Sequence, residues 1–206
     1  MAYCTANDVR LIADLTTADI DDTTLTNLIA VATQKLNADV VALVKDERVE
    51  YIDEVKTNEI DGSNKTFYTK FLYLGDRNDD GTVDVNDVEV YQVDSDGTKT
   101  TLTVSSVDAK EGKFVLDTAP SNVKLYVSYG VCPVPPDSNL LKQACAELTA
   151  AYAFGKIDPQ NVMKIGRLTL KGSSYQFWMS RYYDTLRRIM ASSIPRRVEG
   201  KGIEFK

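Results

Sequence analysis

"CPVPPDSNLL", Cys132 to Leu141, separates two kinds of sequence in this chain of 206 residues. Its three prolines lack an amide hydrogen and cannot join a β-ladder, so a sheet must end at this point. Asp137 or Ser138 then supplies a helix cap, because both side chains accept hydrogen bonds from the free amides at a helix start. We therefore expect strands before this stretch and a helix after it.

The part before the prolines, from about Val49 to Val131, is rich in β-branched and aromatic residues. Its runs are VEYIDEV, KTFYTKFLYL, VEVYQV, KTTLTVSSV, GKFVLD and VKLYVSY. They are separated by turn-forming groups such as DGSN, DSDG, AKEG and APSN. Short strands at this spacing predict a small antiparallel sandwich or barrel, which we assign to residues 49–136.

The flanking segments have the apolar periodicity of helices. A long helix is predicted from Asp21 to Lys45, and a shorter one over TANDVRLIADL with Thr5 as its cap. A third helix follows the prolines. A fourth runs from about Ser174 to Ala191, with an apolar stripe made of Tyr175, Trp178, Tyr182, Leu186 and Ile189.

These helices have no obvious partners except one another, so the two ends of the chain are expected to pack together. The predicted fold class is α+β. Residues 1–48 and 137–206 form a helical domain with a C-terminal tail, and the β domain is inserted between them. Before the last helix, KIDPQNVMKIGRLTLKGSS predicts a short hairpin or an extended arm.

Composition is that of an ordinary soluble globular protein, with 43% hydrophobic and 26% charged residues. No run of about 18 apolar residues is present, and the first residues do not have the pattern of a signal peptide. Cys4, Cys132 and Cys145 form no C-x-x-C pair, so free thiols in a reducing cytoplasm are expected. The net charge is −6, although residues 137–206 hold twelve Lys and Arg against six Asp and Glu.

The stretch DRNDDGTVDVND, Asp76 to Asp87, has the oxygen-ligand spacing of a calcium-binding loop. Gly81 stands at the sixth position, where such a loop turns sharply, and Val83 is placed to anchor the loop to a core. Asp79 is read as a solvated charge. The predicted ligands, at positions 1, 3, 5, 7, 9 and 12, are Asp76, Asn78, Asp80, the Thr82 carbonyl, Asp84 and Asp87.

These twelve residues resemble the dockerin type of EF-hand loop, which closes with Asp rather than Glu. The neighbouring segments FLYL and VEVYQV are predicted strands, so the helices of an EF-hand are not expected here. The alternative interpretation is a hairpin turn rich in Asp, Asn and Gly. If Ca²⁺ binds, one continuous loop saturates it, and the ion orders the loop rather than taking part in a reaction.

No enzymatic activity is expected. The chain has no histidine, which excludes Ser-His-Asp and Cys-His catalysis and histidine-ligated zinc. It has neither of the glycine-rich signatures that cradle phosphates. The run YQFWMSRYYDTLRRIM could stack on nucleic acid, but its helical spacing favours a buried stripe, with Arg181, Arg187 and Arg188 beside it.

The layout resembles the head–tail connector, or adaptor, proteins of tailed bacteriophages and related archaeal viruses. At the start, the resembling segments are YCTANDVRLIADL and DDTTLTNLIAVATQKLNADV. At the end, they are DSNLLKQACAELTAAYAF and YQFWMSRYYDTLRRIM, followed by a short basic tail. The inserted β domain departs from the minimal pattern of that family.

This resemblance implies a structural protein of the virion neck, made in the host cytoplasm. It implies a ring of about twelve copies between the portal protein and a downstream neck or tail completion protein. Genomic double-stranded DNA would pass through the lumen without sequence-specific contacts, and no membrane is involved. Portal binding would fall on the tail from Ser192 to Lys206, through Pro195, Arg196, Arg197, Lys201, Ile203 and Phe205.

A competing hypothesis is a calcium-dependent adhesion or scaffolding module whose β domain binds a protein or a glycan. The acidic loop supports it, whereas the missing signal sequence and the unpaired thiols oppose it. A partner that needs calcium would favour this hypothesis. Binding that survives chelation and depends on the basic tail would favour the connector.

Overall fold

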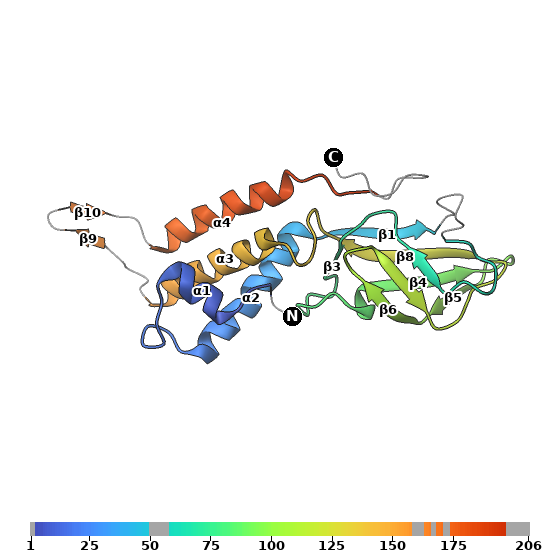
Figure 1. Cartoon of the computed structure of the whole chain (residues 1–206), viewed down its shortest axis with the longest axis horizontal. Helices are drawn as coiled ribbons and strands as arrows, with labels where there is room; N and C mark the ends of the chain where they lie inside the picture. Colours follow the sequence, from blue (N-terminus) through green and yellow to red (C-terminus); the bar gives the residue numbers. More distant parts are fainter. Residues whose placement is uncertain (1–2, 50–57, 158–162, 166–167, 171–173, 197–206) are drawn as a thin grey trace. The chain divides into compact units, whose positions relative to one another are not determined.

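The computed structural model describes residues 3–49, 58–157, 163–165, 168–170 and 174–196. The fold is α+β, with four helices and antiparallel sheets in these residues (Figure 1). The chain divides into two compact units. The helical unit comprises Met1–Val40 and Asp137–Ser192, and the β unit comprises Val41–Pro136 and Ser193–Lys206.

The helical unit contains α1 (Ala6–Ala13), α2 (Asp22–Val40), α3 (Asn139–Ile157) and α4 (Ser174–Met190). The predicted caps are present. The Thr5 side chain accepts a hydrogen bond from the Asp8 amide, and Asp21 accepts one from the Thr24 amide. Of the two candidate caps after the prolines, Ser138 accepts from the Leu140 amide. Three helix starts are therefore determined by local sequence.

Helix α3 is the centre of this unit and packs against α1, α2 and α4. From Ala144 to Ala151 every side chain is buried, which is expected of a helix covered on all sides. Several of these residues are alanines, so neighbouring helices can approach closely. The predicted stripe of α4 is correct at Tyr182 and Ile189, which are fully buried, but wrong at Tyr175, which is exposed.

The second predicted helix ends earlier than expected. We predicted that it runs to Lys45, but α2 ends at Val40, and Ala42–Arg48 forms strand β1. This strand pairs antiparallel with β8 (Lys124–Val131), beginning with Ala42 opposite Val131. Pairing with a buried strand outweighs the helical periodicity of these few residues, and the adjacent Val40 and Val41 favour extended backbone.

The β unit contains two antiparallel sheets. The larger has the order β1-β8-β4-β5, with β3 also paired to β8, and the smaller has the order β2-β7-β6. Their strands are β2 (Thr66–Tyr68), β3 (Leu74–Gly75), β4 (Val88–Val93), β5 (Lys99–Leu102), β6 (Val104–Asp108) and β7 (Lys113–Leu116). In the predicted arm, β9 (Met163–Ile165) and β10 (Leu168–Leu170) pair as a hairpin.

Both sheets contribute to one apolar core. Phe67 of β2 stacks on Phe114 of β7, and Leu125 and Val127 of β8 belong to the same buried cluster. The predicted strand KTTLTVSSV is in fact two strands, because the chain passes from the larger sheet to the smaller one at Thr103. Most of the predicted strand VEYIDEV lies outside the described residues.

Candidate functional site

The acidic loop joins strands β3 and β4 of the β unit. Asp76 directly follows β3, and the short 3-10 helix η1 (Val85–Asp87) leads into β4. Strands therefore flank the loop, as the sequence predicted. Val83 and Val85 pack against the apolar core, which anchors the second half of the loop.

Alternate side chains of the loop fold back onto the backbone in the same way. Asn78 Oδ1 accepts from the Asp80 amide at 3.0 Å, and Asp80 Oδ1 accepts from the Thr82 amide at 2.9 Å. Asp84 Oδ1 accepts from the Asn86 amide at 2.7 Å. These turns hold three of the predicted ligands in a regular series, and positive φ angles at Asp79 (60°) and Gly81 (87°) bend the chain between them.

The carboxylates at the two ends of the loop are buried. Asp76 is 2% exposed and Asp87 is fully buried. Asp76 Oδ2 accepts from the Gly81 amide at 2.6 Å. Asp87 accepts from three amides: those of Arg77 (2.6 Å), Asn78 (3.1 Å) and Asp84 (2.8 Å).

Asp87 therefore links the two ends of the loop, but burial and a neighbouring negative charge disfavour its ionised form. Burial raises the pKa of Asp87, the three amide hydrogen bonds oppose this rise, and the negative charge of Asp76 adds to it. The Arg77 guanidinium, next to Asp76 in sequence, donates to Glu89 at 2.8 Å. Two buried carboxylates within interaction range are an arrangement that a cation stabilises.

The donor set fits a hard cation. It consists of carboxylate, amide and carbonyl oxygens, with neither sulfur nor imidazole. Among the described residues, no group of three or more Asp, Glu and Cys side chains already converges as a ready metal site. A calcium ion here would thus depend on the amide of Asn78 and the carbonyl of Thr82 as well as on carboxylates.

The predicted portal-binding tail begins on the β unit. The Leu72 amide donates to the Pro195 carbonyl at 3.0 Å, and Arg196 forms a β-bridge with Phe71. The Arg196 guanidinium also lies 5.2 Å from the centre of the Phe71 ring. These two residues pack within their own chain, whereas we assigned them to the helical domain. Arg197, Lys201, Ile203 and Phe205 lie outside the described residues.

Sequence reasoning missed a buried carboxylate in the helical unit. Glu147 of α3 is 1% exposed and receives hydrogen bonds from two residues of α4. Thr185 Oγ1 donates to Oε2 at 2.7 Å, and Arg181 Nε donates to Oε1 at 3.2 Å. Gln143, one turn earlier in α3, donates to Oε1 at 2.9 Å. The only sequence signal was an acidic residue inside the otherwise apolar run ACAELTAAYAF.

A second polar contact joins α2 to α4. The Tyr182 hydroxyl donates to Asp39, which also forms an ion pair with Lys35. Burial and this hydrogen bond both raise the pKa of Tyr182, so the hydroxyl keeps its proton. Both carboxylates that hold α4 therefore have a cation from their own unit, Arg181 for Glu147 and Lys35 for Asp39.

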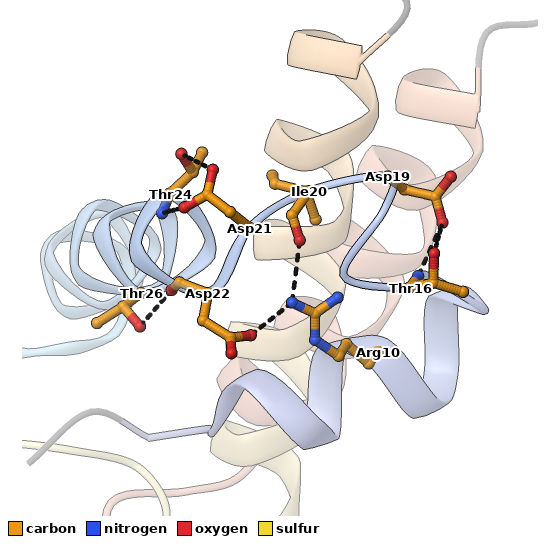
Figure 2. Close-up of polar contacts among 8 residues, drawn as sticks. All are labelled: Arg10, Thr16, Asp19, Ile20, Asp21, Asp22, Thr24 and Thr26. Carbon is orange, nitrogen blue, oxygen red and sulfur yellow. Dashed lines mark hydrogen bonds and ion pairs between the residues drawn. The ribbon is translucent and has the colours of Figure 1, made fainter.

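The connection between α1 and α2 is acidic and is held by local hydrogen bonds (Figure 2). Arg10 Nη2 donates to the Ile20 carbonyl at 3.0 Å and to Asp22 Oδ1 at 2.6 Å. Asp19 accepts from Thr16, and Asp21 accepts from Thr24, so each turn is closed by a carboxylate. Asp14, Asp19, Asp21 and Asp22 are all exposed, which gives this corner an excess of negative charge.

Helices α1 and α4 each present more than one large apolar side chain to solvent, whereas α2 and α3 present one each, Val31 and Ile157. On α1, Leu11 is 84% exposed and Ile12 is 40% exposed. On α4, Tyr183 and Met190 are exposed at a spacing of seven residues, which places them on one face. Met179 and Leu186 extend this face and are partly buried. Exposed Arg187 and Arg188 lie near its C-terminal end.

No protein-family model matches the chain, and no curated protein matches its sequence. In the described residues, no helix has both the length and the apolar character needed to cross a membrane.

Proposed function

We propose that the chain is a subunit of a head–tail connector ring in a tailed virus, placed between the portal protein and the neck or tail. The observation that carries this proposal is the pair of exposed apolar faces on the helical unit. Both α1 and α4 pack on α3, and Figure 1 draws them on different sides of it. The order of helices along the chain and its likeness to connector proteins support the same function.

The two faces differ in charge. The α1 face, made of Asn7, Leu11 and Ile12, adjoins the acidic corner shown in Figure 2. The α4 face, made of Met179, Tyr183, Leu186 and Met190, adjoins Arg187 and Arg188. Contact between the α1 face of one copy and the α4 face of the next would bury apolar surface and pair opposite charges. Such a head-to-tail contact generates a ring when its rotation closes.

A pair of charge-reversal variants tests this contact. The first variant, Arg187→Glu with Arg188→Glu, makes the α4 face acidic. The second, Asn7→Lys with Leu11→Lys, makes the α1 face basic and changes only exposed positions. Each variant alone then has like charges on both faces. In a mixture, the acidic α1 face of the first variant can meet the basic α4 face of the second, and the acidic α4 face of the first can meet the basic α1 face of the second.

Sedimentation velocity of the wild-type chain, each variant and their mixture gives the answer. The proposal expects assembly of the wild type, monomers for either variant alone and recovery of assembly on mixing. Electron microscopy of the assembled fractions should find closed rings. If the α1 variant assembles by itself, α1 is not in the interface. If the wild type remains monomeric at every concentration, the proposed contact is wrong.

The other parts of the chain have separate roles in this proposal. The acidic loop binds Ca²⁺ through Asp76, Asn78, Asp80, Thr82, Asp84 and Asp87, and the ion stiffens the β unit. The tail beyond Arg196 reaches the portal, and its basic residues meet acidic portal surface. A chain that lacks residues 197–206 keeps the contacts of Pro195 and Arg196 with the β unit, so its rings are expected to assemble. These rings should not bind the portal, because the proposed portal-binding residues are gone.

A further inference from the structure

Two of the three cysteines meet inside the helical unit, although 141 positions separate them in sequence. Cys4 precedes α1, and Cys145 lies in the middle of α3. Their Sγ atoms are 2.9 Å apart, and both side chains are buried, at 4% and 0% exposure. A disulfide bond has a length of about 2.05 Å, so a shift of less than about 1 Å separates this contact from a covalent bond.

The surroundings favour reaction between these two thiols rather than with a third. The Cys4 thiol donates to Cys145 Sγ, a bond that raises the pKa of Cys4 and lowers the pKa of Cys145. Thr33 Oγ1 lies 3.7 Å from Cys145 Sγ. Cys132 belongs to the β unit, where burial raises its pKa to about 11. It serves as an internal reference thiol.

Cys4 lies between Tyr3, which donates to Asn37 of α2 at 2.7 Å, and the short helix α1. Helix α1 has eight residues and buries only Val9 and Ala13. Its polar attachments include the Lys142–Asp8 ion pair at 2.9 Å, and Arg10 donates to Asp22 at 2.6 Å and to the Ile20 carbonyl at 3.0 Å. One member of each pair is well exposed to solvent, at 73% for Asp22 and 49% for Lys142, which weakens the pairs. Short terminal elements also open locally more often than the core. Local opening of α1 therefore gives a small oxidant access to Cys4.

We propose that Cys4 and Cys145 form a dithiol site that a small-molecule disulfide, such as oxidised glutathione, converts to an intrachain disulfide. In the first step local opening separates Cys4 Sγ from Cys145, so Cys4 Sγ loses its proton and attacks one sulfur of the oxidant, which releases one thiol and leaves a mixed disulfide. In the second step Cys145 Sγ loses its proton and attacks Cys4 Sγ, which releases the second thiol. Two electrons and two protons thus pass from the cysteines to the oxidant.

The product ties the N-terminal segment to the central helix. The closed loop includes most of the chain, and long loops give the largest loss of entropy in the unfolded state. Opening of α1 would then require breakage of a covalent bond. The oxidised helical unit is expected to melt roughly 5–10 °C higher than the reduced one. This inference does not depend on the proposed function.

The experiment incubates the full chain with oxidised glutathione, removes the oxidant and alkylates the remaining thiols under denaturing conditions. Intact mass and peptide mapping then identify the bonds. We expect one alkylated residue, Cys132, and one crosslink between the peptides that contain Cys4 and Cys145. Hydrogen exchange of the α1 amides should slow in the same sample, and reductant should reverse both changes.

Two variants distinguish this site from general oxidation. Cys132→Ser should form the same crosslink at the same rate, whereas Cys4→Ser should leave Cys145 reduced. The proposal is wrong if the wild type gains stable glutathione adducts at Cys4 and Cys145, forms links to Cys132 or between chains, or stays fully reduced. It is also wrong if the crosslink forms without slowing exchange in α1.

Discussion

The two units of this chain treat buried negative charge differently. In the helical unit, Glu147 is buried between α3 and α4, and Arg181 of the same unit donates to it. In the β unit, Asp76 and Asp87 are equally buried, and the hydrogen bonds that we describe come from backbone amides. An amide contributes a partial charge, whereas a guanidinium contributes a full one.

In our proposal, this difference decides which unit binds an ion. The helical unit contains the cation that its buried carboxylate needs, so its stability should not depend on metal. The acidic loop holds two neighbouring buried carboxylates, an arrangement that a bound cation would stabilise. In our proposal, assembly surfaces lie on the unit that is electrostatically complete, and calcium stiffens the other.

The largest expected effect comes from removing the buried carboxylate of Glu147. Glu147→Ala leaves the Thr185 hydroxyl and the Arg181 guanidinium without their acceptor. The Arg181 side chain is 52% exposed and can turn to solvent, whereas the buried Thr185 hydroxyl keeps no acceptor. The cost should be about 3 kcal/mol, so the helical unit should unfold at lower urea concentration. Circular dichroism at a helical wavelength measures this change.

Asp184→Ala is the matched control, because it removes a carboxylate from an exposed ion pair with Arg187 in the same unit. Its effect should be below about 1 kcal/mol. Added calcium should change neither result. Equal effects of the two substitutions would mean that burial of Glu147 does not determine how much it contributes to the free energy of unfolding.

Calcium itself gives the next largest effect, confined to the β unit. At a hundredfold excess over its dissociation constant, the ion should stabilise this unit by about 2.7 kcal/mol. Calorimetry should show the transition of the β unit moving upwards with calcium and downwards with chelator. Asp87→Ala should abolish the response, because Asp87 joins both ends of the loop.

Asp79→Asn removes one negative charge from the same loop at a position that is not a predicted ligand, and it tolerates the positive φ angle of 60°. The calcium response of this variant should remain. If calcium fails to shift any transition of the wild-type chain, the loop is only a hairpin turn rich in Asp, Asn and Gly.

A smaller effect is expected from Thr185→Val, which keeps the shape of the side chain and removes the donor to Glu147 Oε2. Because Arg181 and Gln143 still donate to Oε1, the cost should be about 1–2 kcal/mol. Thr26→Val, which removes an exposed hydroxyl that donates to a backbone carbonyl, should cost much less. Urea unfolding of both variants compares them, and an equal cost would contradict the importance of the buried network.

Local patterns were sufficient to predict the caps at Thr5 and Asp21 and the sharp turn at Gly81 of the acidic loop. They were insufficient where pairing partners are distant. Strand β1 forms because it pairs with β8, and β5 and β6 belong to different sheets. Local periodicity reveals neither of these facts. The contacts of Glu147 with Arg181, and of Cys4 with Cys145, exist only after α3 has packed against its neighbours.

The division of roles between the two units is tested most directly by sedimentation velocity of the full chain in calcium and in chelator. Our account predicts the same assembled species in both, because the contacting faces belong to the helical unit and need no ion. Assembly that occurs only in calcium would contradict it and would favour the β unit as a calcium-dependent binding module.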